Sequence, residues 1–298
     1  MIKGQPSRTA MLTAVQRAHH YLTAPEPKIL RDSLALALSG LKSKQEAQAY
    51  IDGMIEMFAS LSDHDTAKEF MARIDGAVCM RSRVVEEELL IARERGVQQL
   101  VIFGAGLDST AYRCHELTSG LNVFEVDHPS TQAWKQEQLK SADITIAENV
   151  TFVPFDFENQ TLAEALKEGG VDIEGMTFMT WLGVHMYLSD EAVKATLGVM
   201  GEFPKGSQMV MDFISPSYVE AGEVSESSVE NLREVVSKMG EPMKSKYYES
   251  ELEEILRQSG FSEVHFRNAK WLVDNYLGGV KAAFDTPDEA TSILTAVI

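Results

Sequence analysis

Residues 100–108 have the sequence LVIFGAGLD, in which four apolar residues run directly into two glycines separated by a single residue. A short, wholly apolar run of this kind is typical of a strand that is buried on both faces of a parallel sheet. Two glycines let the chain turn tightly and let backbone N–H groups approach a ligand closely. The third glycine of a dinucleotide-binding fingerprint falls on Ser109, so that pattern is incomplete, and a plain strand-to-helix turn is the alternative.

Similar apolar runs recur along the chain and are separated by segments of helical length. The further runs lie at 121–126, 150–155, 176–181 and 208–214, and the helical segments at 109–118, 129–141, 160–169 and 190–201. Strands that alternate with helices build βαβ units. We therefore expect an α/β fold with a doubly wound, mostly parallel sheet. One more helix at 250–259 and candidate strands at 263–267 and 292–298 follow.

The first part of the chain, residues 1–95, carries apolar positions at helical spacing and no strand signal. Ser7 is placed to cap a first helix, which Pro25 stops. A later helix, starting near Thr66, is expected to end at Gly96, with a possible break at Gly76.

Residues 215–248 interrupt the strand–helix rhythm and are rich in Ser, Glu and Val. We interpret them as a helical insertion after the fifth strand, which forms a lid. The predicted organisation is a single compact unit, with an N-terminal helical cap (1–95) packed on a core (96–298).

Composition limits the partners. The chain has 298 residues, 44% of them hydrophobic, and a net charge of −18 from 27 basic and 45 acidic residues. Such a field repels phosphate backbones, so no nucleic-acid partner is expected. The longest apolar-looking run, 178–188, is about half of what a membrane span needs, and the first residues are too polar for a secretory signal. We expect a cytoplasmic protein without a membrane partner; the sequence carries no signal of its oligomeric state.

Metal and disulfide chemistry are not expected. Cys79 and Cys114 give neither a disulfide framework nor a zinc set, and no histidine has a nearby cluster of ligands.

Acidic residues stand at the ends of the second and third predicted strands. Asp127 follows the glycines by about 20 residues, where ribose hydroxyls need an acceptor. Asp156 and Phe157 end the third run, as a carboxylate that can accept from an adenine amine and a ring that can cover it. Ligands of open α/β sheets bind at the carboxyl ends of strands, so these groups favour a nucleoside-bearing cofactor. Helix capping is the alternative for each acid.

Five motifs together resemble the leucine carboxyl methyltransferase family. They are GAGLDSTAYR at 104–113, FEVDHP at 124–129 followed by Lys135, SRTA at 7–10 with Arg17-Ala18, Arg81-Ser82-Arg83, and GVHMYL at 183–188. The family depends on S-adenosylmethionine and includes bacterial members similar to the tetracenomycin polyketide O-methyltransferase. The likeness covers nearly the whole chain and implies a Rossmann-like methyltransferase sheet.

The resemblance also implies roles for individual residues. It implies that Gly104, Ala105 and Gly106 lie against the methionine part of the cofactor and that Arg81 pairs with the carboxylate of that part. It implies that Asp127 holds the ribose and that Asp156 and Phe157 contact the adenine. It also implies that Tyr187 lies near the transferred methyl group. Arg83 is the substitute if Arg81 points away. The alternative for both arginines is surface pairing with Glu86, Glu87 or Glu88 at helical spacing.

One position departs from the family pattern. Leu182 stands where members usually carry a glutamate that contacts the cofactor, which puts affinity and activity in doubt; we still count Leu182 among the cofactor-binding positions.

Histidines are the candidate bases. His185 is the nearest titratable group to Tyr187, and the two share a face if the fourth strand extends that far. A structural role is the alternative for His185. His19 and His20 could line the site from the first helix.

We expect an S-adenosylmethionine-dependent O-methyltransferase that acts on a hydroxyl or carboxyl of a small organic molecule, such as a polyketide-like or other secondary metabolite. The alternatives are a methyltransferase for protein C-terminal carboxyls, a non-catalytic cofactor-binding relative, and a nicotinamide oxidoreductase, which Ser109 disfavours.

Overall fold

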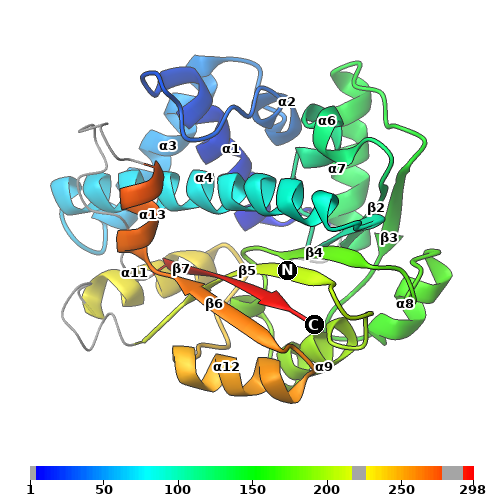
Figure 1. The fold of residues 1–298 in the computed structure, drawn as a ribbon. Helices are drawn as coiled ribbons and strands as arrows, with labels where there is room; N and C mark the ends of the chain where they lie inside the picture. Colours follow the sequence, from blue (N-terminus) through cyan, green and yellow to red (C-terminus); the bar gives the residue numbers. More distant parts are fainter. Residues whose placement is uncertain (1–4, 217–225, 277–290) are drawn as a thin grey trace.

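The computed structural model describes residues 5–216, 226–276 and 291–298, and a single seven-stranded sheet forms its centre (Figure 1). The strand order is β3-β2-β1-β4-β5-β7-β6. The strands are β1 Gln99–Phe103, β2 Asn122–Asp127, β3 Val150–Pro154, β4 Thr177–Trp181, β5 Gln208–Ile214, β6 Glu263–Arg267 and β7 Thr291–Val297. β1 to β5 are parallel, and β7 runs antiparallel to both of its neighbours. The expected α/β fold with a mostly parallel sheet is confirmed.

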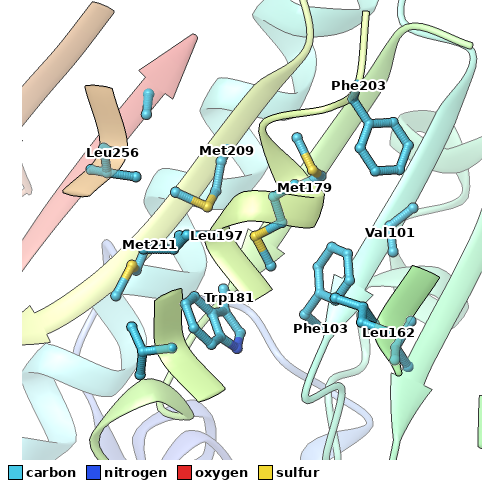
Figure 2. Packing of buried hydrophobic residues seen from close by; sticks show 14 of the residues in the cluster. Val101, Phe103, Leu162, Met179, Trp181, Leu197, Phe203, Met209, Met211 and Leu256 are labelled. Carbon is cyan, nitrogen blue, oxygen red and sulfur yellow. The ribbon is translucent and has the colours of Figure 1, made fainter. Parts of the chain in front are cut away.

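Each face of the sheet packs against its own layer of helices, because successive side chains of a strand point to opposite faces. Leu100 and Ile102 of β1 belong to the core cluster that α4 covers. Val101 and Phe103 belong to the cluster on the other face, where Figure 2 shows them near Met179 and close to the helices that carry Leu162 and Leu197. Every residue of β1 and β4 is buried, as expected for central parallel strands.

Four helices precede the sheet. They are α1 Arg8–Thr23, α2 Ala35–Ser39, α3 Lys44–Ala59 and α4 His64–Glu94. Ser7 caps α1 as predicted, and its hydroxyl accepts a hydrogen bond from the backbone N–H of Ala10 at 3.0 Å. The helix ends before Pro25. Gly96 follows α4 with a φ of 95°, in the left-handed region that favours glycine.

The possible break at Gly76 is absent, because α4 runs through it without interruption. A glycine inside a helix costs about 1 kcal/mol relative to alanine. Gly76 and the residues that follow it are buried, and α4 packs along β4 and β5. Tertiary packing of one long helix therefore outweighs the local preference. The division into a cap (1–95) and a core (96–298) stays a prediction.

The remaining helices follow the expected rhythm, with one difference. They are α5 Thr110–Arg113, α6 His115–Thr118, α7 Pro129–Ser141, α8 Leu162–Glu168, the 3₁₀ helix η1 His185–Tyr187, α9 Asp190–Met200, α11 Glu226–Lys238, α12 Glu249–Gln258 and α13 Ala269–Tyr276. The helix expected at 109–118 is split into α5 and α6. α11 lies within the predicted insertion, of which 217–225 fall outside the described residues. Every helix in the described parts of the chain is too short or too polar to span a bilayer.

An ion pair is buried between α7 and β2. Lys135 Nζ lies 2.6 Å from Glu125 Oε2, and the two side chains are 1% and 0% exposed. Removing one partner of such a pair leaves the other charge buried without compensation, which is far more costly than losing a surface pair.

We expect Lys135→Met to lower the free energy of unfolding by about 3–5 kcal/mol, because the Glu125 carboxylate then stays buried without a cation. Urea unfolding followed by circular dichroism measures the change. Lys140→Met, at an exposed position in the last turn of the same helix, is the matched control and should change stability by less than about 0.5 kcal/mol. Equal effects of the two substitutions would show that the pair does not stabilise the fold.

Candidate active site

A cavity of about 670 Å³ lies at the carboxyl ends of the parallel strands, between the sheet and helices α1, α4 and α11. The loops that follow β1, β2, β3 and β4 all contribute to its wall, and β5 contributes Asp212. β1 pairs with β2 on one side and with β4 on the other, so the order in which the chain adds strands changes direction at β1. The cavity thus occupies the edge at which open α/β sheets bind ligands.

The loop after β1 forms one wall of the cavity. Gly104 and Gly106 have φ values of 62° and 49°. A Cβ at Gly104 would lie 2.2 Å from a methyl group of Val184, so no side chain fits there. Gly104 also donates its N–H to Val126 O at 2.7 Å, which ties the loop to the neighbouring strand. The loop is a tight turn that presents bare backbone to the cavity.

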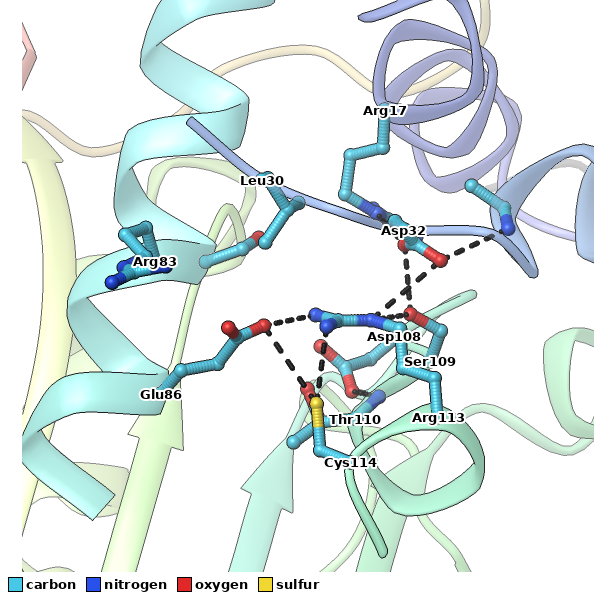
Figure 3. A network of polar contacts seen from close by, with 12 residues as sticks. Arg17, Leu30, Asp32, Arg83, Glu86, Asp108, Ser109, Thr110, Arg113 and Cys114 are labelled. Carbon is cyan, nitrogen blue, oxygen red and sulfur yellow. Dashed lines mark hydrogen bonds and ion pairs between the residues drawn. The ribbon is translucent and has the colours of Figure 1, made fainter. Parts of the chain in front are cut away.

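A network of charged groups holds the far side of this loop (Figure 3). Asp32 is buried and pairs with Arg17 of α1 at 2.9 Å, while Ser109 donates its hydroxyl to the same carboxylate at 2.7 Å. Arg17 also donates to Leu107 O at 2.6 Å. Because Arg113 lies 3.6 Å from Asp32 and pairs with Glu86, α1, α4 and the glycine loop are joined by one network.

Asp127 is held by the backbone at the end of β2. One carboxylate oxygen accepts the N–H of Gly106, and the other accepts the N–H of His128 at 2.5 Å. Burial raises the pKa of the Asp127 carboxyl, while the two N–H groups act in the opposite direction. Asp127 and His128 both line the cavity. Each oxygen keeps lone-pair capacity for a further donor.

The loop after β3 supplies the groups expected to contact an adenine. Asp156 and Phe157 both line the cavity. The Phe157 ring lies edge-on to Phe155, with ring centroids 4.8 Å apart, and stacks near Trp181 at 6.5 Å. The Asp156 carboxylate accepts from Asn159 Nδ2 at 2.8 Å and from the N–H of Glu158 at 3.0 Å, so part of its capacity is used within its own loop.

Arg81 enters the cavity from α4 and meets an acid that the sequence reasoning missed. Arg81 Nη1 lies 2.6 Å from Asp212 Oδ2, and Asp212 Oδ1 accepts the N–H of Gly183, also at 2.6 Å. The Arg81 side chain is 13% exposed. Arg83 points elsewhere: it pairs with Glu87 on the exposed side of α4 and does not line the cavity. The surface-pairing alternative therefore describes Arg83 and not Arg81.

Residues 10–201 match the family model described as leucine carboxyl methyltransferase. The chain belongs to this family. A protein of Bacillus subtilis strain 168 named "Putative S-adenosyl-L-methionine-dependent methyltransferase YktD" is 32% identical over 275 residues, which are 87% of this chain and 88% of that protein. A protein with the same description from Mycobacteroides abscessus is 28% identical over 210 residues, 70% of this chain and 65% of its own length.

Solved structures confirm the fold of this family member. A DUF574 family protein from Streptomyces avermitilis MA-4680 superposes with a TM-score of 0.58 at 15% identity, covering 95% of this chain and 96% of its own. A "putative methyltransferase" from Thermobifida fusca YX superposes with a TM-score of 0.57 at 16% identity, covering 99% and 96%. These structures confirm the expected sheet, and the family model and the Bacillus subtilis relative confirm the family resemblance.

Most of the positions expected from the family lie around one cavity. The lining includes Gly104, Ala105, Gly106, Asp127, Asp156, Phe157, Arg81, Leu182 and Tyr187. Their individual roles stay predictions. Leu182, where family members usually carry glutamate, faces the cavity and packs in part against the core.

His185 is not brought to the cavity. The condition under which it would share a strand face with Tyr187 is not met, because β4 ends at Trp181 and residues 185–187 form a 3₁₀ helix instead of extended strand. Tyr187 lines the cavity, whereas the His185 ring is buried near Trp181 and Tyr247, with centroids 6.3 Å and 6.0 Å away. Neither ring nitrogen of His185 has a hydrogen-bond partner among the described residues. This setting supports the structural alternative.

The other expected histidines also lie outside the cavity lining. His19 contacts Asp75 at 3.3 Å and Gln48 at 3.0 Å, and the hydrogen bond with Asp75 is the main cause that raises its pKa. His20 is buried, and burial lowers its pKa to about 4. Within the described residues no cluster of His, Cys, Asp and Glu side chains could hold a metal ion.

The segment after α11 contributes contacts that no local sequence signal indicated. Glu241 accepts hydrogen bonds from the N–H groups of Arg8 and Thr9, at 3.0 and 3.1 Å, and so places a carboxylate at the positive end of α1. Lys244 Nζ lies 2.7 Å from Glu158 Oε1 in the loop after β3. The insertion therefore touches the site from two sides.

We expect His185→Phe to flatten the pH dependence of stability. Burial lowers the pKa of His185 to about 4, whereas an unfolded chain titrates near 6.5. As pH falls from 7 to 5, His185 binds a proton in the unfolded state but not in the folded state. This residue therefore lowers the free energy of unfolding by roughly 2 kcal/mol over that range. Urea unfolding at pH 7 and pH 5 measures the difference. His115→Phe, at an exposed position of α6, should keep the full slope, and an unchanged slope in His185→Phe would contradict the expectation.

Proposed function

We propose that the chain transfers a methyl group from S-adenosylmethionine to an oxygen atom of a small organic molecule. As a member of the leucine carboxyl methyltransferase family it is an S-adenosylmethionine-dependent methyltransferase. The observation that carries the finer proposal is the continuity of the cavity. Part of its wall is the glycine loop with the strand-end acids, and part is a set of apolar side chains from α1, α3, α4 and α11; we call these the polar end and the apolar chamber.

The polar end fits the cofactor part by part. Gly104 and Gly106 line the cavity with backbone alone, and we assign the methionine portion to this wall. The place that a Cβ would take at each glycine is filled by Val184 and by Ala10. We assign the ribose hydroxyls to Asp127, whose two oxygens keep lone pairs for further donors. We assign the adenine to Asp156 and Phe157, which line the same cavity with an acceptor and a ring. Arg81 offers a guanidinium fork for a carboxylate.

The other end of the cavity favours an acceptor with a large apolar surface. Its walls come from α1, α3, α4 and α11 and consist of Leu12, Phe58, Met71, Ile74, Val78, Leu232, Val235 and Val236. Thr13 and Gln16 of α1 also face the cavity and can hydrogen-bond a polar group of the acceptor. A cavity with mostly apolar walls and a few polar groups is typical of small-molecule sites. This chamber supports a hydrophobic, aromatic or polyketide-like acceptor.

Positioning and exclusion of water account for the catalysis in this proposal. When bound, the cofactor supplies an electrophilic methyl carbon on its sulfonium. The chain's own residues hold the acceptor oxygen in line with that carbon; the C–S electron pair stays on sulfur as the new C–O bond forms. A carboxylate acceptor is already ionised and needs no base. A hydroxyl acceptor releases its proton to bulk solvent outside the site, and His185, which does not line the cavity, takes no part in that transfer.

Tyr187 is the residue that we place beside the acceptor oxygen. It is half-buried at the cavity wall, and desolvation, followed by the Glu241 carboxylate, raises its pKa to about 12. The phenol therefore stays protonated at neutral pH and can donate a hydrogen bond to the acceptor, which positions the oxygen. It cannot serve as a base under these conditions.

The test is transfer of isotopically labelled methyl from S-adenosylmethionine to a panel of small phenols, alcohols and carboxylic acids, followed by mass spectrometry. We expect a methyl ether or ester of an apolar member of the panel together with S-adenosylhomocysteine. Tyr187→Phe should lower kcat about tenfold or more by removing one hydrogen bond at the reacting oxygen, with little change in cofactor affinity. Tyr21→Phe, on α1 outside the cavity lining, is the matched control and should keep normal turnover.

The same assay separates the alternatives. The family's description favours carboxyl methylation of a protein C-terminus as the second candidate, and methyl esters on proteins of a treated lysate, with no transfer to the panel, would support it instead. Tight binding of the cofactor without turnover on small molecules or proteins would indicate a relative that only binds.

A further inference from the structure

The acid that faces Arg81 occupies a particular place in the sheet. In the register between β4 and β5, Trp181 lies opposite Met211, so the next pair along the strands is Leu182 and Asp212. Both residues belong to the face of the sheet that α4 covers: Leu182 packs against the core cluster on that face, and Asp212 has the same parity as Val210 of that cluster. The two positions are therefore neighbours on one face of the sheet, at the wall of one cavity.

We propose that Asp212 provides from β5 the carboxylate that the family usually provides from the position of Leu182, and that it binds the α-ammonium group of the cofactor. Arg81 then takes the α-carboxylate, so the pair matches a zwitterion with opposite charges. This inference rests on the proposed function of the cavity as a site for S-adenosylmethionine.

The geometry leaves both side chains able to bind a ligand. Each oxygen of Asp212 accepts one hydrogen bond, from Arg81 or from the N–H of Gly183, whereas a carboxylate offers about four lone-pair sites. Arg81 uses one of its N–H donors on Asp212. The Arg81 and Asp212 side chains are 13% and 3% exposed, so the two charges are largely removed from water. Away from water, hydrogen bonds to ionised groups are strong.

The backbone at Gly183 is shaped for this pair. Gly183 has a φ of 68°, and a Cβ there would lie 2.9 Å from Arg81 Nη1. The guanidinium thus packs against bare backbone, and the same residue donates its N–H to Asp212. The Leu182 side chain has no group that could accept a hydrogen bond from an ammonium, whereas the Asp212 carboxylate next to it lines the cavity and can.

The experiment compares ligands that differ only at the amino-acid end. Wild type and Asp212→Asn are titrated calorimetrically with S-adenosylhomocysteine, with its analogue lacking the α-amino group, and with 5′-methylthioadenosine, which lacks the whole amino-acid portion. We expect Asp212→Asn to weaken S-adenosylhomocysteine about tenfold or more, since a charged hydrogen bond is lost. It should change binding of the other two ligands less than about twofold, because neither presents an ammonium.

A second variant tests whether a carboxylate at position 182, after β4, can take the place of the Asp212 carboxylate on β5. Adding Leu182→Glu to Asp212→Asn restores the glutamate usual in the family, and we expect it to recover part of the lost affinity for S-adenosylhomocysteine and none for the analogue without the amino group. Normal affinity of Asp212→Asn for 5′-methylthioadenosine shows that this variant is folded.

Two outcomes overturn the inference alone. Equal losses for S-adenosylhomocysteine and for its analogue without the amino group would mean that Asp212 only positions Arg81, and an unchanged affinity for S-adenosylhomocysteine would mean that Asp212 makes no contact. Failure of the wild type to bind S-adenosylhomocysteine would instead overturn the proposed function, and the inference with it.

Discussion

The Asp127 carboxylate joins two neighbouring strands where the cavity begins, and the arrangement of the cavity depends on that contact. One oxygen holds the N–H of Gly106 in the loop after β1, and the other holds the N–H of His128 after β2. Because β1 and β2 are adjacent and parallel, a single side chain can orient both loops at once. The left-handed backbone at Gly106 makes that N–H available, which a residue with a Cβ allows only at the cost of strain.

Burial also affects the charge of the Asp127 carboxylate. Removing the Asp127 carboxylate from water raises its pKa, although two N–H donors offset part of that change. Arg81 and Asp212 lie around the same cavity and are likewise removed from water. Buried charges that face a cavity are costly to the fold and are typical of functional sites. Lys135 and Glu125 do not line the cavity, so we explain their buried ion pair by its contribution to the stability of the fold.

Much of this could be predicted from the sequence, for reasons that differ from element to element. The apolar runs after Gln99 and Thr177 identified the central strands because both faces of these strands are buried. Strand ends meet at one edge of a parallel sheet, so the sequence predicts that Asp127 and Asp156 lie close together. The resemblance to the family pointed to Arg81 as a ligand of the cofactor.

The positions that the sequence did not predict have two causes. Some contacts depend on where a strand ends, and others join distant parts of the chain. His185 would share a face with Tyr187 only if β4 continued that far, whereas residues 185–187 form a 3₁₀ helix and the His185 ring is buried near Trp181. Asp212 went unnoticed because its partner Arg81 is 131 residues away. Glu241 reaches the first turn of α1 across more than 230 residues, and no periodicity in the sequence indicates such a contact.

The most direct measurement is a calorimetric titration of S-adenosylhomocysteine into the wild type and into Asp127→Asn. We predict one binding site per chain in the wild type and an affinity at least about tenfold weaker in the variant, since the ribose hydroxyls lose their charged acceptor. Absence of binding to the wild type at millimolar ligand, or equal affinity in the two proteins, would contradict the account of the strand ends as one adenosyl site.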